Sequence, residues 1–187
     1  AEAAAAAAHV PVLLSEVLGA FEGLRLRTYV DCTLGAGGHA CAVLAAHPEV
    51  EAVVGIDRDP DAHALAGPRL RAALGGRPGV DLRLRVGNFG DLGAIVQGEH
   101  AAGLPHAPTA VLLDLGVSSM QLDRPSRGFS FAVDGPCDMR MGPDAELDAA
   151  EAVNTWPEEE LGRVFREYGE ERHWRLLARR GCAARLD

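Results

Sequence analysis

The chain has 187 residues, of which 48% are hydrophobic, and its formal net charge at pH 7 is -9. This length suffices for one domain with a substantial core, and no apolar run approaches the roughly 20 residues that a membrane-spanning helix needs. The acidic balance argues against a broadly cationic nucleic-acid-binding surface.

Residues 12–113 alternate between helical and strand patterns. Apolar residues at helical spacing predict helices at 12–21, 38–46, 60–74 and 92–96, followed by a Gly/Pro/His-rich loop at 98–108. Asp59 and Pro60 are the expected N-cap and first residue of the third helix. Short apolar or alternating runs predict strands at 29–33, 52–56, 82–86 and 110–113, of which the last is apolar on both sides like a buried parallel strand. The alternation predicts a doubly wound α/β sheet with ligands at the carboxyl ends of its strands.

The rest of the chain has a different character. Residues 115–145 are rich in Gly, Pro, Ser, Asp and Arg with little periodicity, which predicts a long ordered loop of a kind that is often functional. Helical patterns return at 150–156, 157–168 and 170–185. The four cysteines form no CxxC pair and the histidines no HExxH-like pair, so we expect free thiols in a reducing compartment and no bound metal.

A glycine-rich segment, DCTLGAGGH at Asp31–His39, lies where the first strand turns into a helix. Glycine there permits positive φ and close approach of a ligand to the backbone, and the helix N-terminus offers unpaired N–H groups. His39 either donates to the ligand or caps the loop. The order G-x-G-G-H differs from the GxGxxG fingerprint, which favours a nucleoside ligand without pyrophosphate, such as S-adenosylmethionine, over a nicotinamide dinucleotide.

Three further positions follow strand ends and should meet the glycine loop at one crevice. Asp57 is placed to accept hydrogen bonds from a ribose diol, with a helix N-cap as the simpler alternative. Phe89 is either a flat apolar surface for a purine ring or a core residue capping the third strand. Asp114 follows the fourth strand.

The later motifs identify a resemblance. LLDLGVSSMQLD (112–123), DRPSRGFSF (123–131) and DGPCDMRM (134–141), together with DCTLGAGGH, IDRDP (56–60) and YGEER (168–172), closely resemble the MraW/RsmH-type family. Its members are bacterial and organellar methyltransferases that act on N4 of a cytidine in small-subunit ribosomal RNA. Met120 departs from the family pattern, because many bacterial relatives have proline there.

The resemblance implies a Rossmann-like class I methyltransferase fold with S-adenosyl-L-methionine as cofactor. On this basis, residues 1–145 form the cofactor-binding domain with an incomplete parallel sheet, and 146–187 begin a helical insertion that belongs to the substrate domain. The implied location is the cytoplasm of a bacterium, or a chloroplast or mitochondrion of a eukaryote, without membrane association. The implied cofactor contacts are Gly37, Gly38, His39, Asp57, Phe89, Asp114 and Gln121, the last from the family alone.

Asp114 is the candidate catalytic residue. Cytosine N4 is a poor nucleophile because its lone pair is delocalised into the ring, so an acceptor for its N–H would assist methyl transfer. The alternative is that Asp114 binds the amino-acid or sulfonium end of the cofactor. Arg124, Arg127 and Arg140 are expected either to meet RNA phosphates or to pair with Asp residues that shape the loop.

The resemblance implies small-subunit ribosomal RNA as the partner. Family members continue well past residue 187, so it stays open whether this piece of the chain is active by itself. The competing interpretation is a non-catalytic ribosome-assembly or cofactor-binding module left by truncation. A nicotinamide-dependent oxidoreductase is a more distant alternative.

Overall fold

The computed structural model describes residues 10–185, and the chain divides into two compact units, residues 1–116 and 117–187. The sequence analysis instead divides the chain at residue 145, into a cofactor-binding domain and the start of a helical insertion, and these two functional assignments remain predictions. Each unit is described by itself.

A parallel sheet of four strands forms the centre of the first unit. The strands are β1 (Thr28–Asp31), β2 (Ala52–Asp57), β3 (Asp81–Val86) and β4 (Ala110–Leu112), in the order β3-β2-β1-β4. Val30 of β1 pairs with Val54 on one side and with Val111 on the other. The predicted doubly wound α/β fold is therefore confirmed, with strand ends shifted by one or two residues.

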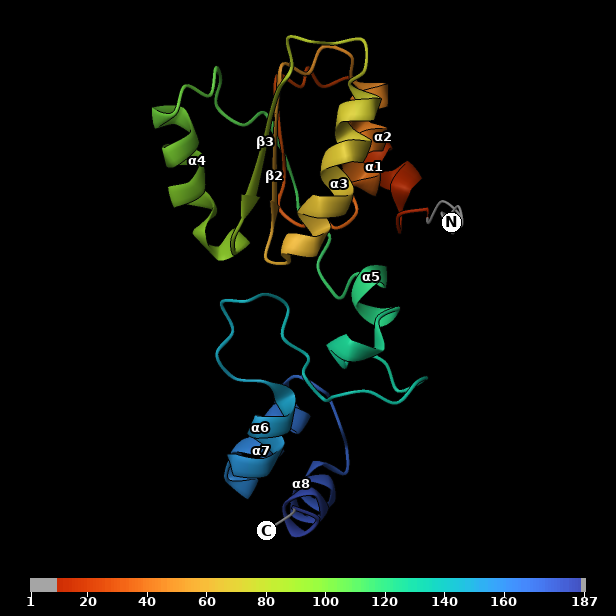
Figure 1. The fold of residues 1–187 in the computed structure, drawn as a ribbon, viewed down its shortest axis with the longest axis vertical. Helices are drawn as coiled ribbons and strands as arrows, with labels where there is room; N and C mark the ends of the chain where they lie inside the picture. The colour runs from red at the N-terminus through yellow and green to blue at the C-terminus, as the bar shows by residue number, and fades with distance from the viewer. Residues whose placement is uncertain (1–9, 186–187) are drawn as a thin grey trace. The chain divides into compact units, whose positions relative to one another are not determined.

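Helices cover both faces of this sheet (Figure 1). Three lie against one face: α1 (Leu14–Phe21), α2 (Gly38–Ala46) and α3 (Pro60–Ala73). The other face packs against α4 (Leu92–Ala101). Successive strand residues point to opposite faces, so Tyr29 joins the core under α2 and α3 whereas Val30 joins the core under α4.

The fourth helix is longer than its sequence pattern predicted. Residues 98–101 were expected to be loop, and they form the last turn of α4. Glu99 in this turn is 3% exposed and pairs with Arg83 (2.9 Å) and with Arg85, both on β3. Because those ion pairs are tertiary contacts, the local sequence did not reveal the extra turn.

The fourth strand differs from the prediction in its burial. It was expected to be buried on both faces, but Val111 is 39% exposed and Leu113, just beyond the strand, is 46% exposed. Within the described sheet β4 pairs only with β1 and forms an edge. Apolar side chains of this run are therefore left partly uncovered by the residues that the structure describes.

The regular elements that the structure describes in the second unit are all helices or helical turns. The unit contains α5 (Ser119–Leu122), α6 (Ala149–Thr155), α7 (Glu158–Glu167) and α8 (Trp174–Ala183), so the predicted loop at 115–145 holds one short helix and a 3-10 turn at Pro125–Arg127. The helices α7 and α8 meet where Gly162 lies against the Trp174 ring. A Cβ at residue 162 would lie only 2.9 Å from that ring, so the close packing requires glycine.

Among residues 10–185, no helix combines the length and apolar character needed to cross a bilayer. The same residues contain no group of three or more His, Cys, Asp or Glu side chains arranged to hold a metal ion. All four cysteines are free thiols.

Candidate functional site

The segment between β1 and α2 is hydrogen-bonded to both neighbouring strands. The Cys32 amide donates to the Leu112 carbonyl at the end of β4 (2.9 Å), and the Leu34 amide donates to the Ile56 carbonyl on β2 (3.0 Å). Two residues of this segment, Cys32 and Leu34, are thus tied to the strands on opposite sides of β1. This arrangement brings the ends of β1, β2 and β4 together, as the sequence predicted.

Asp57 organises the glycine loop through its carboxylate. Its Oδ2 accepts from the Gly35 amide (2.7 Å), and its Oδ1 accepts from the Asp59 amide (2.9 Å). The N-cap of α3 is Asp59, as predicted, with Oδ1 accepting from the Asp61 amide (3.0 Å). Each Asp57 oxygen retains a further lone pair, so the ribose-binding role remains chemically open and remains a prediction.

The glycines of the loop serve the packing of the protein itself. Gly35 and Gly37 have φ of 49° and 77°, in the left-handed region that side chains disfavour. A Cβ at Gly37 would lie 3.1 Å from the Ala66 Cβ, and one at Gly38 would lie 2.6 Å from Pro11 Cγ. At Gly35, by contrast, a Cβ would meet almost nothing, so open space for a ligand adjoins that residue alone among the three.

Asp31, the last residue of β1, is a buried carboxyl that the sequence analysis did not single out. It is 1% exposed and accepts from the Tyr29 hydroxyl (3.2 Å) and the Thr33 amide (3.1 Å). Burial raises the pKa of Asp31, the two hydrogen bonds lower it, and the nearby carboxylates of Asp57 and Asp114 raise it, with a net value of about 7. The centre of the site therefore holds an acid that titrates near neutral pH.

Asp114 lies beside the glycine loop and contacts it through both its backbone and its side chain. Its backbone amide donates to Thr33 Oγ1 (2.8 Å), and its Oδ2 lies 3.4 Å from Nε2 of His39. The Asp114 side chain is 50% exposed, whereas that of His39 is only 8% exposed. Asp114 and His39, which the sequence analysis named separately as candidate site residues, thus lie side by side.

His39 has unused hydrogen-bonding capacity. Neither ring nitrogen makes a hydrogen bond with the residues that the structure describes, although both are buried. Buried polar atoms normally find partners. His39 also follows Gly37 and Gly38 in the first turn of α2, which has no side-chain cap, so backbone N–H groups there lack intrahelical acceptors. An orphaned imidazole and uncapped amides fit a polar ligand at this helix end.

Phe89 begins a 3-10 turn, Phe89–Asp91, just after β3. Its side chain is 38% exposed, which argues against the alternative of a core residue. Asn88 caps this turn by accepting from the Gly90 amide (2.9 Å), and the Gly87 amide donates to the Asp57 carbonyl (2.9 Å). Phe89 therefore presents apolar surface near the carboxyl end of β2, and its contact with a cofactor remains a prediction.

Gln121 belongs to the second unit and is 5% exposed. The side-chain Oε1 of Gln121 accepts from the backbone amide of Ser118 (2.9 Å), and the backbone amide of Gln121 donates to the Ser118 hydroxyl (3.3 Å). This reciprocal capping box fixes the start of α5. The capping box by itself accounts for a buried polar side chain at this position. The cofactor contact that the family resemblance implies for Gln121 remains a prediction.

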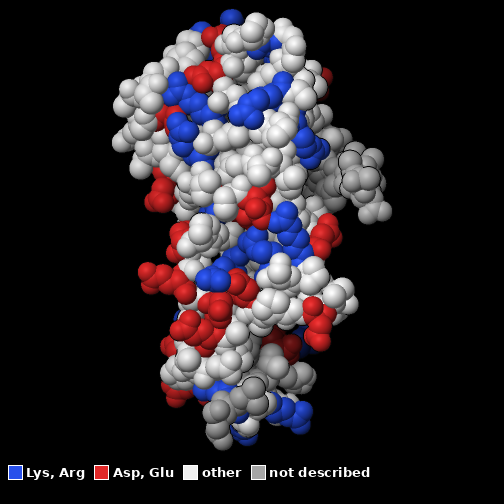
Figure 2. All heavy atoms as spheres, in the orientation of Figure 1, with Lys and Arg blue, Asp and Glu red and all other residues white. Residues whose placement is uncertain are grey.

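The loop arginines are engaged in holding the loop. Arg140 forms an ion pair with Asp138 (2.6 Å), which lowers the pKa of that carboxyl to about 2. Arg127 donates to the Arg140 carbonyl (2.8 Å). Figure 2 shows arginines and acidic side chains next to one another on the face that it draws. These contacts favour the shape-holding interpretation, and phosphate binding by the same side chains remains untested.

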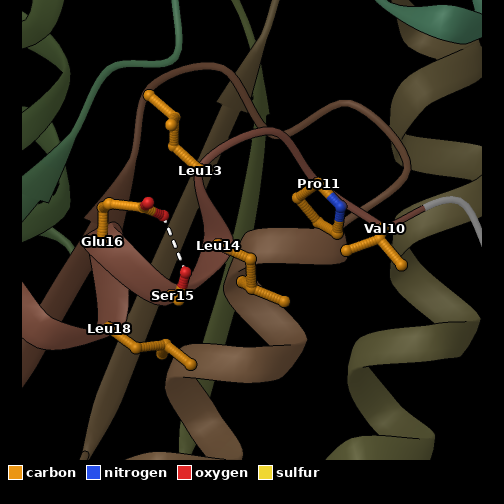
Figure 3. A pocket seen from close by; sticks show the side chains of 7 residues that line it. All are labelled: Val10, Pro11, Leu13, Leu14, Ser15, Glu16 and Leu18. Carbon is orange, nitrogen blue, oxygen red and sulfur yellow. Dashed lines mark hydrogen bonds between the residues drawn. The ribbon is translucent and has the colours of Figure 1, made fainter.

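A pocket of about 520 Å³ lies on α1 and the segment before it (Figure 3). Apolar side chains dominate its wall, and Ser15 donates to Glu16 within it (2.8 Å). Pro11 connects this wall to the glycine loop through its contact with Gly38. None of the predicted cofactor-contacting residues lines the pocket, whose lining is Val10, Pro11, Leu13, Leu14, Ser15, Glu16 and Leu18.

Sequence reasoning missed two polar residues of the site, Asp31 and Thr33. Both stand in DCT: Asp31 ends a strand whose four residues are all buried, and Thr33 follows two residues later. A charged residue that ends such a strand is a signal that could have identified Asp31. The role of Thr33 depends on the position of β4, 81 residues away in the chain, and left no local signal.

The chain is similar to known methyltransferases over nearly its whole length. A profile of the MraW methylase family matches residues 6–186. Among the similar proteins are several named Ribosomal RNA small subunit methyltransferase H. The one from Protochlamydia amoebophila is 48% identical, over 95% of this chain and 53% of its own length. The one from Methylobacterium sp. (strain 4-46) is 52% identical, over 96% of this chain and 50% of its own length. The chain thus spans about half the length of the curated relatives that it matches.

Proposed function

Because the chain belongs to the MraW methylase family, we propose that it provides the cofactor-binding half of an S-adenosyl-L-methionine-dependent methyltransferase acting on N4 of a cytidine in small-subunit ribosomal RNA. The observation that carries the proposal is that the glycine loop is hydrogen-bonded to two acidic residues, to the carboxylate of Asp57 and to the backbone amide of Asp114. Gly35 is bonded to Asp57, and Thr33 of the same loop is bonded to the Asp114 amide. A nucleoside with a positively charged end suits such a site.

The residues present fit this cofactor. Asp57 has lone pairs for a ribose diol, and Phe89 offers an exposed aromatic face for an adenine ring. The uncapped start of α2 and the orphaned His39 offer polar partners for an amino-acid end. When bound, S-adenosylmethionine supplies an activated methyl group, so the protein mainly positions donor and acceptor.

Asp114 is the residue that we propose to act at the reacting end. Its half-exposed carboxylate can accept a hydrogen bond from an exocyclic amine, which would make the nitrogen a better nucleophile and stabilise developing positive charge. The same carboxylate could instead hold the cationic end of the cofactor. A base in single-stranded RNA reaches such a crevice at low cost, because it need not leave a duplex.

Two measurements test the proposal. Calorimetry of the 187-residue chain with S-adenosylmethionine and S-adenosylhomocysteine tests the cofactor, and transfer of labelled methyl groups to unmodified small ribosomal subunits tests the reaction. Binding together with transfer supports the full proposal. Binding without transfer favours a cofactor-binding module for this chain. Absence of binding of either nucleoside contradicts the proposal.

A further inference from the structure

We propose that Thr33 is a positioning residue for Asp114: its hydroxyl fixes the Asp114 backbone at the end of β4, so that the carboxylate faces the cofactor site. This inference rests on the proposed function in the form in which the Asp114 carboxylate holds the cationic end of the cofactor, because it assigns the purpose of the tether to cofactor binding. Thr33 is not among the cofactor contacts that the family resemblance implies.

The contacts of Asp114 carry the inference. The residue follows the three-residue strand β4 and precedes Leu115 and Gly116, which are exposed and outside any regular element. Among the described residues, its polar contacts are the hydrogen bond to Thr33 and the approach to His39. Since the carboxylate is half exposed, packing does not hold it in place. The hydrogen bond from the Asp114 backbone amide to the Thr33 hydroxyl anchors the backbone at this residue.

Thr33 is itself held from the other side. Its amide donates to Oδ1 of the buried Asp31 (3.1 Å), which is the end of the central strand. The two bonds form a chain from Asp31 through Thr33 to Asp114. Through it, the buried inner strand β1 sets the position of an otherwise exposed loop residue.

A second threonine provides a matched comparison at the opposite end of the same strand pair. Thr109, just before β4, accepts from the Arg27 amide (2.9 Å) and donates to the Thr28 carbonyl (3.0 Å). Thr33 and Thr109 thus both join β1 to β4 through a hydroxyl. Only Thr33 does so at the carboxyl ends, where the candidate site lies.

The test compares Thr33→Val, which keeps the shape but loses the acceptor, with Thr33→Ser, which keeps the acceptor. Calorimetry with S-adenosylmethionine should show that Thr33→Val weakens affinity by about three- to ten-fold, the value of one hydrogen bond. Thr33→Ser should stay within about two-fold of wild type. Thr109→Val should lower the thermal midpoint without changing the affinity.

A double-mutant cycle separates positioning from general loosening. In an Asp114→Ala background, Thr33→Val should cause no further loss of affinity, because the side chain that it positions is gone. An equal loss in both backgrounds overturns the inference, as does a Thr33→Val affinity equal to wild type or a Thr33→Ser affinity as weak as that of Thr33→Val.

Amide hydrogen exchange reports the tether without any ligand. The Asp114 amide should exchange more slowly than those of Leu115 and Gly116 in wild type, and lose this protection in Thr33→Val. An unprotected wild-type amide overturns the inference while leaving the proposed function standing. A protected amide in a chain that binds neither nucleoside contradicts the proposed function, and with it the purpose assigned to Thr33.

Discussion

The Gly35 amide donates a 2.7 Å hydrogen bond to Oδ2 of Asp57, and this bond joins the first strand–helix turn to the end of the second strand. The same carboxylate accepts from Asp59, whose side chain caps α3. One side chain therefore links the glycine loop to the start of the next helix. Its loss should disturb the site and the fold together.

Asp57→Asn should weaken S-adenosylmethionine binding by at least about ten-fold and lower the free energy of unfolding by about 1–3 kcal/mol, because one amide oxygen replaces two charged acceptors. Calorimetry and urea denaturation measure the two effects. Asp91→Asn is a suitable control, since Asp91 is exposed in the turn after β3 and its change should stay within about 0.5 kcal/mol. Asp57→Asn with wild-type affinity would remove Asp57 from the cofactor site.

Asp31 should make stability depend on pH. Because burial raises its pKa to about 7 from 3.8, the folded protein holds a proton between about pH 4 and 7 that the unfolded chain releases. The contribution of Asp31 to the free energy of unfolding should therefore fall as pH rises through this window, by at most about 1.4 kcal/mol per pH unit, and become constant above it.

Asp31→Asn isolates this contribution. The difference in unfolding free energy between the variant and wild type should shift in favour of the variant as the pH rises from 5 to 7, whatever constant penalty the amide adds. Urea denaturation at pH 5, 6, 7 and 8 provides the comparison. A difference that is the same at every pH would mean that Asp31 is ionised throughout.

Gly37→Ala should cost about 1–3 kcal/mol, because alanine is strained at φ 77°. Its Cβ would also lie 3.1 Å from that of Ala66, so α2 and α3 would have to separate slightly. Gly98→Ala is the matched control: residue 98 lies inside α4 with open space around it, so the change should stabilise by about 0.5–1 kcal/mol. Equal effects at both positions would contradict the close packing at Gly37.

In a chain that transfers methyl groups to small ribosomal subunits, Asp114→Ala should abolish the transfer, whether the carboxylate acts on the acceptor amine or on the cofactor. Calorimetry distinguishes the two roles, because only the second predicts a large loss of S-adenosylmethionine affinity. The thermal midpoint should change little, since the side chain is half exposed. Transfer within a few-fold of wild type would exclude both roles.

Most of the fold was predictable because its signals are local. The alternation of strand and helix patterns, the Asp59 cap followed by Pro60, and the start of α2 after the glycines are set by neighbours in the chain. The errors occurred where distant residues decide. Glu99 extends α4 through ion pairs to β3, and Val111 of β4 is exposed at the sheet edge, because β4 has one strand partner among the described residues.

The candidate site divides in the same way. The approach of its glycines to Asp57 and Asp114 could be predicted, because parallel strands place their carboxyl ends at one edge. The bonds between them could not, and Gln121 shows the limit, since its side chain caps its own helix.

By itself, the sequence determined the order and direction of the elements and the residue types at the strand ends, since periodicity, capping and backbone freedom act over a few residues. Only the tertiary structure decided that Asp31 is buried with a raised pKa, that His39 lies beside Asp114, and that Thr33 holds the end of β4. The physical reason is that burial and hydrogen bonding depend on which distant segments share a space, and no short stretch of sequence contains that information.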